Sequence, residues 1–203
     1  MQKQDYKHFI ERIMEKNYFE DQQYNKVDFT EKQIEPGEYE NCEFINCNFS
    51  NTDLSDITFA ECEFKGCNLS SAKLNKTTLR DTRFKECKLL GLHFDHCNDF
   101  IFTVCFDGCL LNLSSFYKLK LKKTTLKNCT LHEVDFTETD LTSSVFENCD
   151  FAGAIFENTI LEKADFSSSF NYSINPDINK IKKAKFSASG VLGLLGKYDI
   201  EIV

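Results

Sequence analysis

A large apolar residue recurs at every fifth position from residue 124 to residue 166. A small residue stands two places before it, and the other positions are mostly polar, as in Cys129-Thr130-Leu131-His132-Glu133. A strand repeats its faces every two residues and a helix about every 3.6, so neither explains this period. The period fits a chain that turns a corner after each unit and sends one small and one large side chain inward. It therefore predicts a solenoid, built from stacked repeats.

The spacing of the cysteines predicts the number of sides. Cysteines recur at intervals of twenty residues, in the two series Cys47, Cys67, Cys87 and Cys109, Cys129, Cys149. If like residues stack, one coil has twenty residues and four units of five. The chain is then an all-β solenoid, a β-helix with a square cross-section. About eight coils fit into residues 27–186.

The register of the large apolar residues changes once along the chain. One register runs through residues 29–94, and from residue 106 onward the apolar positions are displaced by two. An insertion is therefore expected within residues 95–105, where an Asn-Asp pair favours a turn. The aromatic residues of this segment are expected to fold back onto the core. The alternative is a protruding contact loop formed by Asn98, Asp99, Phe100 and Phe102.

Both ends of the chain differ from the repeats. Within residues 1–26, an apolar face with helical spacing predicts a helix over residues 5–20 that caps the first coil. Residues 187–203 are expected to form a short helical cap and a terminal strand. This tail is too apolar to stay exposed, so we expect it to join two copies in a homodimer, unless it folds back completely. The predicted dimer interface consists of Val191, Leu192, Leu194, Leu195 and Ile200.

The chain has ten cysteines, of which nine lie two places before the central position of a repeat unit. Cys105 is the exception. The nine are expected to be buried free thiols in ladders, not disulfides or zinc ligands. His93-x-x-His96-Cys97 is the one cluster that suggests a metal, but the two histidines are expected at different positions around the repeat. Since no catalytic constellation or cofactor motif is found, we expect neither enzyme activity nor a cofactor.

The net charge of -8 is unevenly distributed. Acidic residues dominate 28–63 and 133–165, and basic residues dominate 73–88 and 118–127. One interpretation is an ordinary solvated surface; the other is two acidic patches that bind a basic partner. The candidate partner-binding acids are Glu43, Asp53, Glu63, Glu133, Asp135, Asp140, Asp150 and Asp165.

The overall negative charge disfavours direct binding of nucleic acid. No apolar run is long enough to span a membrane. The first residues lack the apolar core of a signal peptide. We therefore expect a cytoplasmic protein that does not bind membranes.

The repeat units resemble those of the pentapeptide-repeat family, as in Cys47-Asn48-Phe49, Thr139-Asp140-Leu141 and Ala164-Asp165-Phe166. That resemblance implies a right-handed quadrilateral β-helix. Within the family, residues 134–140, residues 171–176 and the ending Asp199-Ile200-Glu201-Ile202 are similar to the albicidin-resistance, microcin-immunity and quinolone-resistance (Qnr) proteins.

This narrower resemblance implies a homodimer joined at its C-terminal ends. It also implies an acidic rod that imitates duplex DNA, binds DNA gyrase or another type II topoisomerase, and protects it from inhibitors such as quinolones. Because a fold does not determine a function, the alternative is an interaction scaffold with another, unknown partner.

Overall fold

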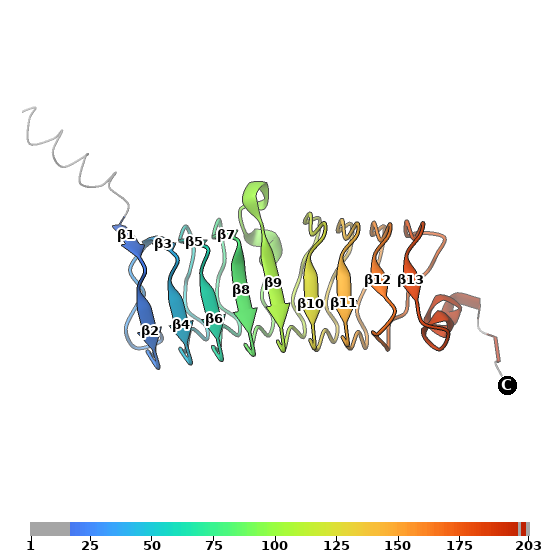
Figure 1. Cartoon of the computed structure of the whole chain (residues 1–203), viewed down its shortest axis with the longest axis horizontal. Helices are drawn as coiled ribbons and strands as arrows, with labels where there is room; N and C mark the ends of the chain where they lie inside the picture. The colour runs from blue at the N-terminus through green and yellow to red at the C-terminus, as the bar shows by residue number, and fades with distance from the viewer. Residues whose placement is uncertain (1–16, 199, 202–203) are drawn as a thin grey trace, which may run out of the picture.

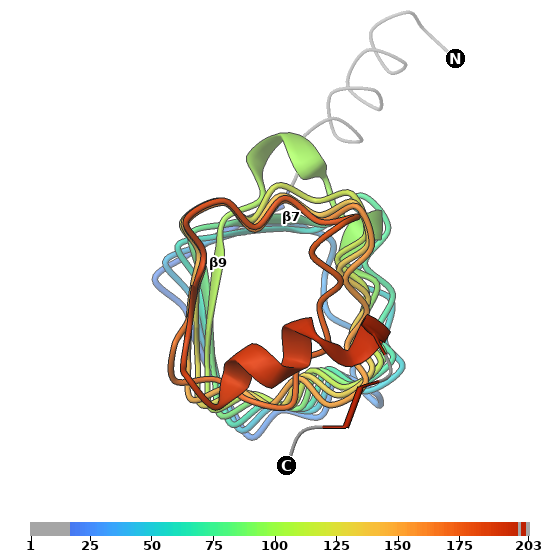
Figure 2. The same ribbon diagram turned by 90° about the vertical axis from the view of Figure 1, so that its right-hand side faces the viewer.

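The computed structural model describes residues 17–198, 200 and 201. Its coils stack side by side into a rod (Figure 1), and a view along the rod shows a four-sided outline (Figure 2). All strand pairs are parallel, and successive strands of a sheet come from successive coils. The chain is thus an all-parallel β-solenoid of about eight turns, as the period and the cysteine spacing predicted.

The strands lie on two sides of the rod. The first sheet contains β1 (Asn17–Glu20), β3 (Gly37–Glu40), β5 (Thr58–Ala60) and β7 (Thr78–Arg80). The second sheet contains β2 (Gln23–Asn25), β4 (Glu43–Ile45), β6 (Glu63–Lys65), β8 (Thr82–Lys85), β9 (Val104–Asp107), β10 (Thr125–Lys127), β11 (Val145–Glu147), β12 (Asp165–Phe166) and β13 (Lys185–Phe186). Isolated parallel bridges such as Asn48 to Asn68 join the coils elsewhere.

The corners explain why one position of each unit is polar or glycine. At one corner the N–H of Thr52 donates to the carbonyl of Phe49 across 3.1 Å, and Asn51 has a φ of 57°. A positive φ at the third residue identifies a type II turn, where glycine and asparagine are the residues that tolerate the conformation best. The same position in other coils is left-handed too, as at Asn128 and Glu133.

The large side chains form ladders of stacked rings inside the rod. Phe44 and Phe64 lie 4.7 Å apart between ring centroids, and Phe64 and Phe84 lie 5.1 Å apart. The small side chains two places earlier bond to the neighbouring coil. The Cys67 thiol donates to the carbonyl of Phe44 across 3.2 Å, and the Thr139 hydroxyl donates to that of Phe116 across 2.8 Å. Cysteine, threonine and serine suit this position because they are small and can donate a hydrogen bond, and apolar residues such as Ala72 and Ala164 occupy it in other units.

The solenoid begins earlier in the chain than residue 27, the predicted start. β1 pairs with β3, Phe19 stacks on Tyr39 at 4.6 Å and Tyr24 stacks on Phe44 at 4.9 Å. The helix predicted for residues 5–20 is therefore wrong over Asn17–Glu20, and its earlier part lies outside the described residues. The boundary between residues 26 and 27 is wrong for the same reason. Phe19 and Tyr24 already stand in the five-residue register, and pairing with the next coil satisfies their backbone groups.

The insertion adds two residues to one coil and contains two short 3-10 helices, η1 (Phe94–His96) and η2 (Asp99–Ile101). It projects from the rod between β8 and β9 (Figure 1). Phe102 is buried and packs edge-on against Phe94, with centroids 6.1 Å apart. Phe100 is 89% exposed, so the expectation that it folds back is wrong. The Asn98 side chain accepts the N–H of Phe100 across 3.3 Å, and this local turn leads the chain outward.

The tail forms η3 (Gly190–Leu194) and η4 (Gly196–Tyr198), which lie across the end of the rod (Figure 2). The carbonyl of Gly193 accepts the N–H of Ile174 across 2.9 Å. A Cβ at Gly193 would stand 2.1 Å from the carbonyl oxygen of Tyr172, so only glycine permits this contact. The predicted terminal strand is absent at Ile200 and Glu201, because the tail is already paired through η3; the rest of that strand lies outside the described residues.

Candidate protein-binding surfaces

The candidate acids are spread around the rod. Glu43 and Glu63 stand side by side in β4 and β6, and Asp165 lies farther along the same sheet in β12. The other aspartates lie in ladders of isolated bridges elsewhere on the rod, Asp53 with Lys73, Asp135 with Ser115, Asp140 with Lys120, and Asp150 with Thr130. Because a coil turns through all four sides within twenty residues, the acids form bands around the rod and not one-sided patches. That they bind a basic partner stays a prediction.

Five of these acids also hold the corners of the coils. Each aspartate accepts a hydrogen bond from the backbone N–H two residues later, at distances of 2.8–3.2 Å. The donors are Ser55 for Asp53, Thr137 for Asp135, Thr142 for Asp140, Ala152 for Asp150 and Ser167 for Asp165. These carboxylates therefore have a structural role, which could have been predicted because aspartate and asparagine commonly form such turns.

Basic side chains of adjacent coils lie beside several of the acids. Lys122 Nζ lies 3.1 Å from Asp140, His132 Nε2 lies 2.8 Å from Asp150, and Lys185 Nζ lies 2.9 Å from Asp165. The hydrogen bonds from Lys185 and Ser167 lower the pKa of Asp165 to about 2. The hydrogen bonds from Ser55 lower the pKa of Asp53. All these carboxylates are thus ionised at neutral pH.

The glutamates are freer than the aspartates. Glu43 accepts a hydrogen bond from the exposed side chain of Gln23 across 2.8 Å, and Glu63 stands next to Arg83 in the sheet register. Glu133 occupies a left-handed corner with a φ of 56°. None of the three accepts the corner hydrogen bond that the five aspartates accept. Glu43 and Glu133 are therefore the candidate acids that can be changed with least effect on the coils.

The basic segment 118–127 is partly neutralised by the coil that follows it. Lys127 Nζ lies 2.8 Å from Glu147, and Lys118 Nζ lies 3.6 Å from Glu138. The hydrogen bond to Glu147 raises the pKa of Lys127. This part of the rod therefore presents alternating charges and not a uniformly positive surface.

Two exposed apolar surfaces lie away from the acidic bands. In the insertion, Phe100 and Ile101 are exposed. At the C-terminal end, Val191, Leu192 and Ile200 are exposed, while Leu194 packs against the core and Leu195 is half-buried. The predicted interface residues are thus divided between an outer face and an inner face of the cap.

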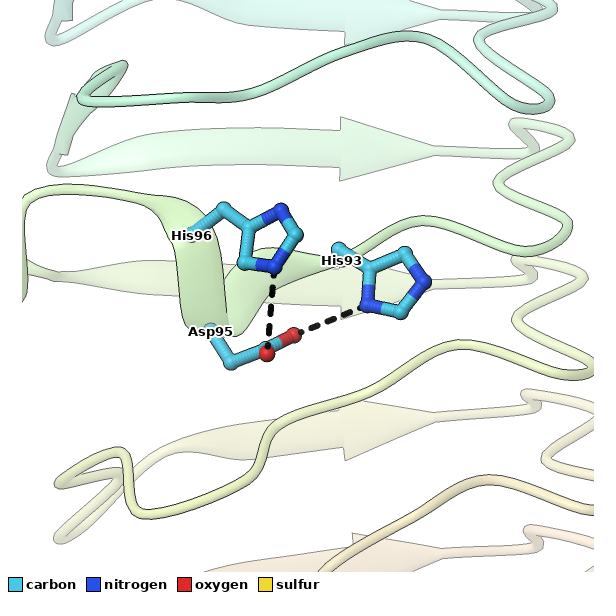
Figure 3. A group of neighbouring side chains, drawn as sticks. All are labelled: His93, Asp95 and His96. Carbon is cyan, nitrogen blue, oxygen red and sulfur yellow. Dashed lines mark ion pairs between the residues drawn. The ribbon is translucent and has the colours of Figure 1, made fainter.

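His93 and His96 lie close together and flank Asp95 (Figure 3). The expectation that the two histidines stand at different positions is wrong, because η1 replaces the usual left-handed corner and brings both rings to one side.

Among the residues that the structure describes, no helix is long and apolar enough to cross a membrane.

The fold and these surfaces define a solenoid repeat protein, with its polar chemistry on the outside of the coils and an apolar core inside. A family profile described as a pentapeptide repeat region matches residues 37–99 and 99–170. The chain therefore belongs to the pentapeptide-repeat family, as its units suggested.

Several solved structures share this architecture. HetL, a pentapeptide-repeat protein involved in heterocyst differentiation regulation in the cyanobacterium Nostoc, is 15% identical, with a TM-score of 0.55 over 90% of this chain and 92% of HetL. QnrB1, a plasmid-mediated fluoroquinolone resistance protein, is 18% identical, with a TM-score of 0.47 over 92% of this chain and 100% of the other. These similarities concern the fold alone. No curated protein sequence matches this chain.

Proposed function

We propose that this chain is a non-enzymatic DNA mimic that binds a type II topoisomerase such as DNA gyrase and counters inhibitors such as quinolones. The observation that carries the proposal is the distribution of carboxylates around the rod. Duplex DNA presents phosphates all around its axis, so bands of acids on every side are closer to it than a one-sided patch. A cytoplasmic location is part of the proposal.

The spacing of the charges limits the kind of mimicry. Coils stack about 4.8 Å apart, whereas phosphates follow one another about every 3.4 Å along a DNA strand. The rod can therefore imitate the field and the outline of a duplex, but not its atoms one by one. The choice of a topoisomerase rests on the similarity of residues 134–140 and 171–176 to the drug-resistance members of the family.

The proposal includes a homodimer joined at the C-terminal cap. Val191 and Leu192 are 41% and 49% exposed on the outer face of the cap. A twofold contact would cover these residues on both copies with the same surface. It would also place two acidic rods end to end and so lengthen the surface that imitates DNA.

A second candidate function is an interaction scaffold with a different partner. Phe100 is 89% exposed and projects from the insertion next to Ile101. Exposed apolar clusters commonly mark protein-binding sites, and a DNA duplex has no corresponding feature. In this alternative the insertion, with Asn98 and Asp99 at its start, would anchor the partner and the acidic bands would be ordinary solvated surface.

A supercoiling assay with purified gyrase, with and without a quinolone, tests the proposal. We expect inhibition or protection at micromolar protein. Glu43→Lys combined with Glu133→Lys should weaken the effect, and lysine is tolerated at the left-handed corner because Lys163 occupies such a corner itself. Phe100→Ser is the matched variant for the alternative. The absence of any effect of the wild-type protein would contradict the gyrase proposal and leave the scaffold with a different partner. Sensitivity to Phe100→Ser alone would show that the insertion and not the acids contacts gyrase, and would contradict DNA mimicry.

A further inference from the structure

Three side chains with metal-binding atoms converge at the start of the insertion. His93 Nδ1 lies 3.3 Å from one carboxylate oxygen of Asp95, and His96 Nε2 lies 3.7 Å from the other (Figure 3). One atom from each residue lies within 4.8 Å of the other two. All three residues stand at or beside η1, so they are close in sequence as well as in space.

The backbone of η1 determines this arrangement. The N–H of His96 donates to the carbonyl of His93 across 3.2 Å, and the N–H of Cys97 donates to that of Phe94 across 3.0 Å. The imidazole rings of His93 and His96 consequently stack, with centroids 4.8 Å apart and planes 13° apart. A regular left-handed corner at His96 would have directed the second ring elsewhere. The rings thus face the carboxylate from the same side.

The carboxylate is the least exposed member of the group. The side chain of Asp95 is 16% exposed, whereas those of His93 and His96 are 59% and 51% exposed. Within the described part of the chain, Asp95 Oδ1 is buried and accepts no hydrogen bond, although His93 Nδ1 lies 3.3 Å from it. A buried carboxylate oxygen without a hydrogen bond is costly, and a cation held between the carboxylate and the two rings would satisfy it.

We propose that His93, Asp95 and His96 form a binding site for a divalent transition-metal ion. Zinc lies about 2.0–2.2 Å from imidazole nitrogen and carboxylate oxygen, so two ligands of a tetrahedral ion stand about 3.4 Å apart. The distances of 3.3 Å from His93 Nδ1 to Asp95 Oδ1 and of 3.7 Å from His96 Nε2 to Asp95 Oδ2 are close to that separation, and each ring faces a different oxygen of the carboxylate. Rotation of the exposed rings brings the two nitrogens closer together. Three protein ligands leave one position for water or for a group from a partner.

The ligand set selects the class of ion. Imidazole nitrogens bind zinc, nickel and copper well, whereas magnesium and calcium require oxygen ligands. Two of the three ligands proposed here are imidazoles. Zinc or nickel is therefore expected to bind, and magnesium is not.

The site has a clear place in the fold. η2 begins at Asp99, and the exposed Phe100 follows it directly. A metal ion would connect both ends of η1, and would fix the segment from which the insertion projects. Bound metal should therefore order a part of the described rod that departs from the regular coil.

Calorimetric titration of the full, reduced chain with zinc chloride and with nickel chloride tests the site. Magnesium chloride serves as the ion that should not bind. Cys105→Ser is used as the common background, because Cys105 is the one cysteine that is not buried. We expect saturable binding of one zinc or nickel ion per chain.

His93→Ala and His96→Ala should each weaken binding by more than about tenfold, since even outer-shell partners of metal ligands contribute 10–100-fold. Both rings are exposed, so circular dichroism should show unchanged folding. His132→Ala is the matched control, because His132 is also an imidazole beside a carboxylate, that of Asp150, and should leave binding unchanged. No saturable binding to the wild-type site, or equal binding by the His93→Ala and His96→Ala proteins, would overturn the proposal.

Discussion

The ring of Phe84 stacks on the ring of Phe106, with centroids 5.4 Å apart and planes 13° apart, although the two residues are 22 positions apart. Regular neighbours such as Phe44 and Phe64 are 20 positions apart. The two additional residues are therefore accommodated outside the core, and β8 and β9 pair in the same way as the other strands. A solenoid can absorb an insertion at a corner because each coil contacts only its neighbours.

Phe136→Ala should reduce the free energy of unfolding by about 3–5 kcal/mol. Phe136 is fully buried, and its ring stacks between Phe116 at 5.4 Å and Phe156 at 5.3 Å. Stacked coils cannot close the cavity, because the backbone spacing is held by the ladders. Urea unfolding measures the loss. Ile155→Ala, at a position 45% exposed on the next coil, is the control and should change stability by only about 0.5 kcal/mol. Similar losses for the two variants would contradict the inward placement of Phe136.

The two aromatic residues of the insertion should respond differently to truncation. Phe102→Ala should cost about 3 kcal/mol of unfolding free energy because Phe102 packs on Phe94. Phe100→Ala should stay within about 0.5 kcal/mol of the wild type, since Phe100 is exposed. The two variants, compared in the same urea titration, control for each other. A larger loss for Phe100→Ala would mean that the insertion folds back onto the rod.

Thiol reactivity should separate Cys105 from the other cysteines. All ten cysteines are free, and nine of them are buried. Burial raises the pKa of the Cys62 thiol to about 12, so its reactive thiolate is scarce at neutral pH. In the folded protein, a thiol reagent should rapidly modify no cysteine other than Cys105. After unfolding without a reductant, it should modify all ten cysteines. A count well below ten after unfolding would indicate disulfides and contradict the thiol ladders.

Acid should destabilise the protein in part through Asp165. Its pKa is lowered to about 2 in the folded state, against about 3.9 in an unfolded chain. The stabilisation is therefore fully present above about pH 4 and is lost as the pH falls through about 2. Asp165→Asn keeps an acceptor for Ser167 but loses the charge that pairs with Lys185. Urea unfolding should show this variant weaker than the wild type at pH 7 and equal to it at the acid end. A difference in unfolding free energy that persists at the acid end would contradict an ionic origin of the stabilisation by Asp165.

Light scattering should give twice the monomer mass of 23.5 kDa. Leu192→Arg should produce folded monomers, because Leu192 is 49% exposed on the cap and a charge there would oppose its burial between copies. Ile155→Arg is the control, since Ile155 is 45% exposed on the side of the rod. A wild-type protein that is monomeric at tens of micromolar would refute the proposed interface.

Repetition made the core predictable. The residues that stack, such as Phe116, Phe136 and Phe156, appear in the sequence as one unbroken register. Phe19 and Tyr24 stand in that register too, and the apolar spacing of the residues before them led to the incorrect extension of the helix. At this end, two periodic patterns overlap, and pairing with the next coil decided between them.

The candidate sites were less predictable than the core. The sequence identifies the acids, but the side of the rod on which each acid lies depends on the number of corners between them. His93 and His96 meet because the chain makes a 3-10 turn at η1 in place of a left-handed corner. The side on which an acid lies and the contact between the two histidines cannot be predicted from residue type. Both depend on backbone dihedral angles, which the neighbouring coils determine.

The sequence by itself determined the period, the coil length, the four sides and the identity of the buried residues. These follow from the requirement that one apolar side chain of each unit be buried away from water. The spacing of the apolar residues in the sequence is enough to show this. Only the tertiary structure decided that the rod begins by Asn17, that Phe102 is buried while Phe100 is exposed, and that Asp95 lies between two imidazoles. Those outcomes depend on hydrogen bonds between coils twenty or more residues apart, which select one local conformation among several that the same residues could adopt.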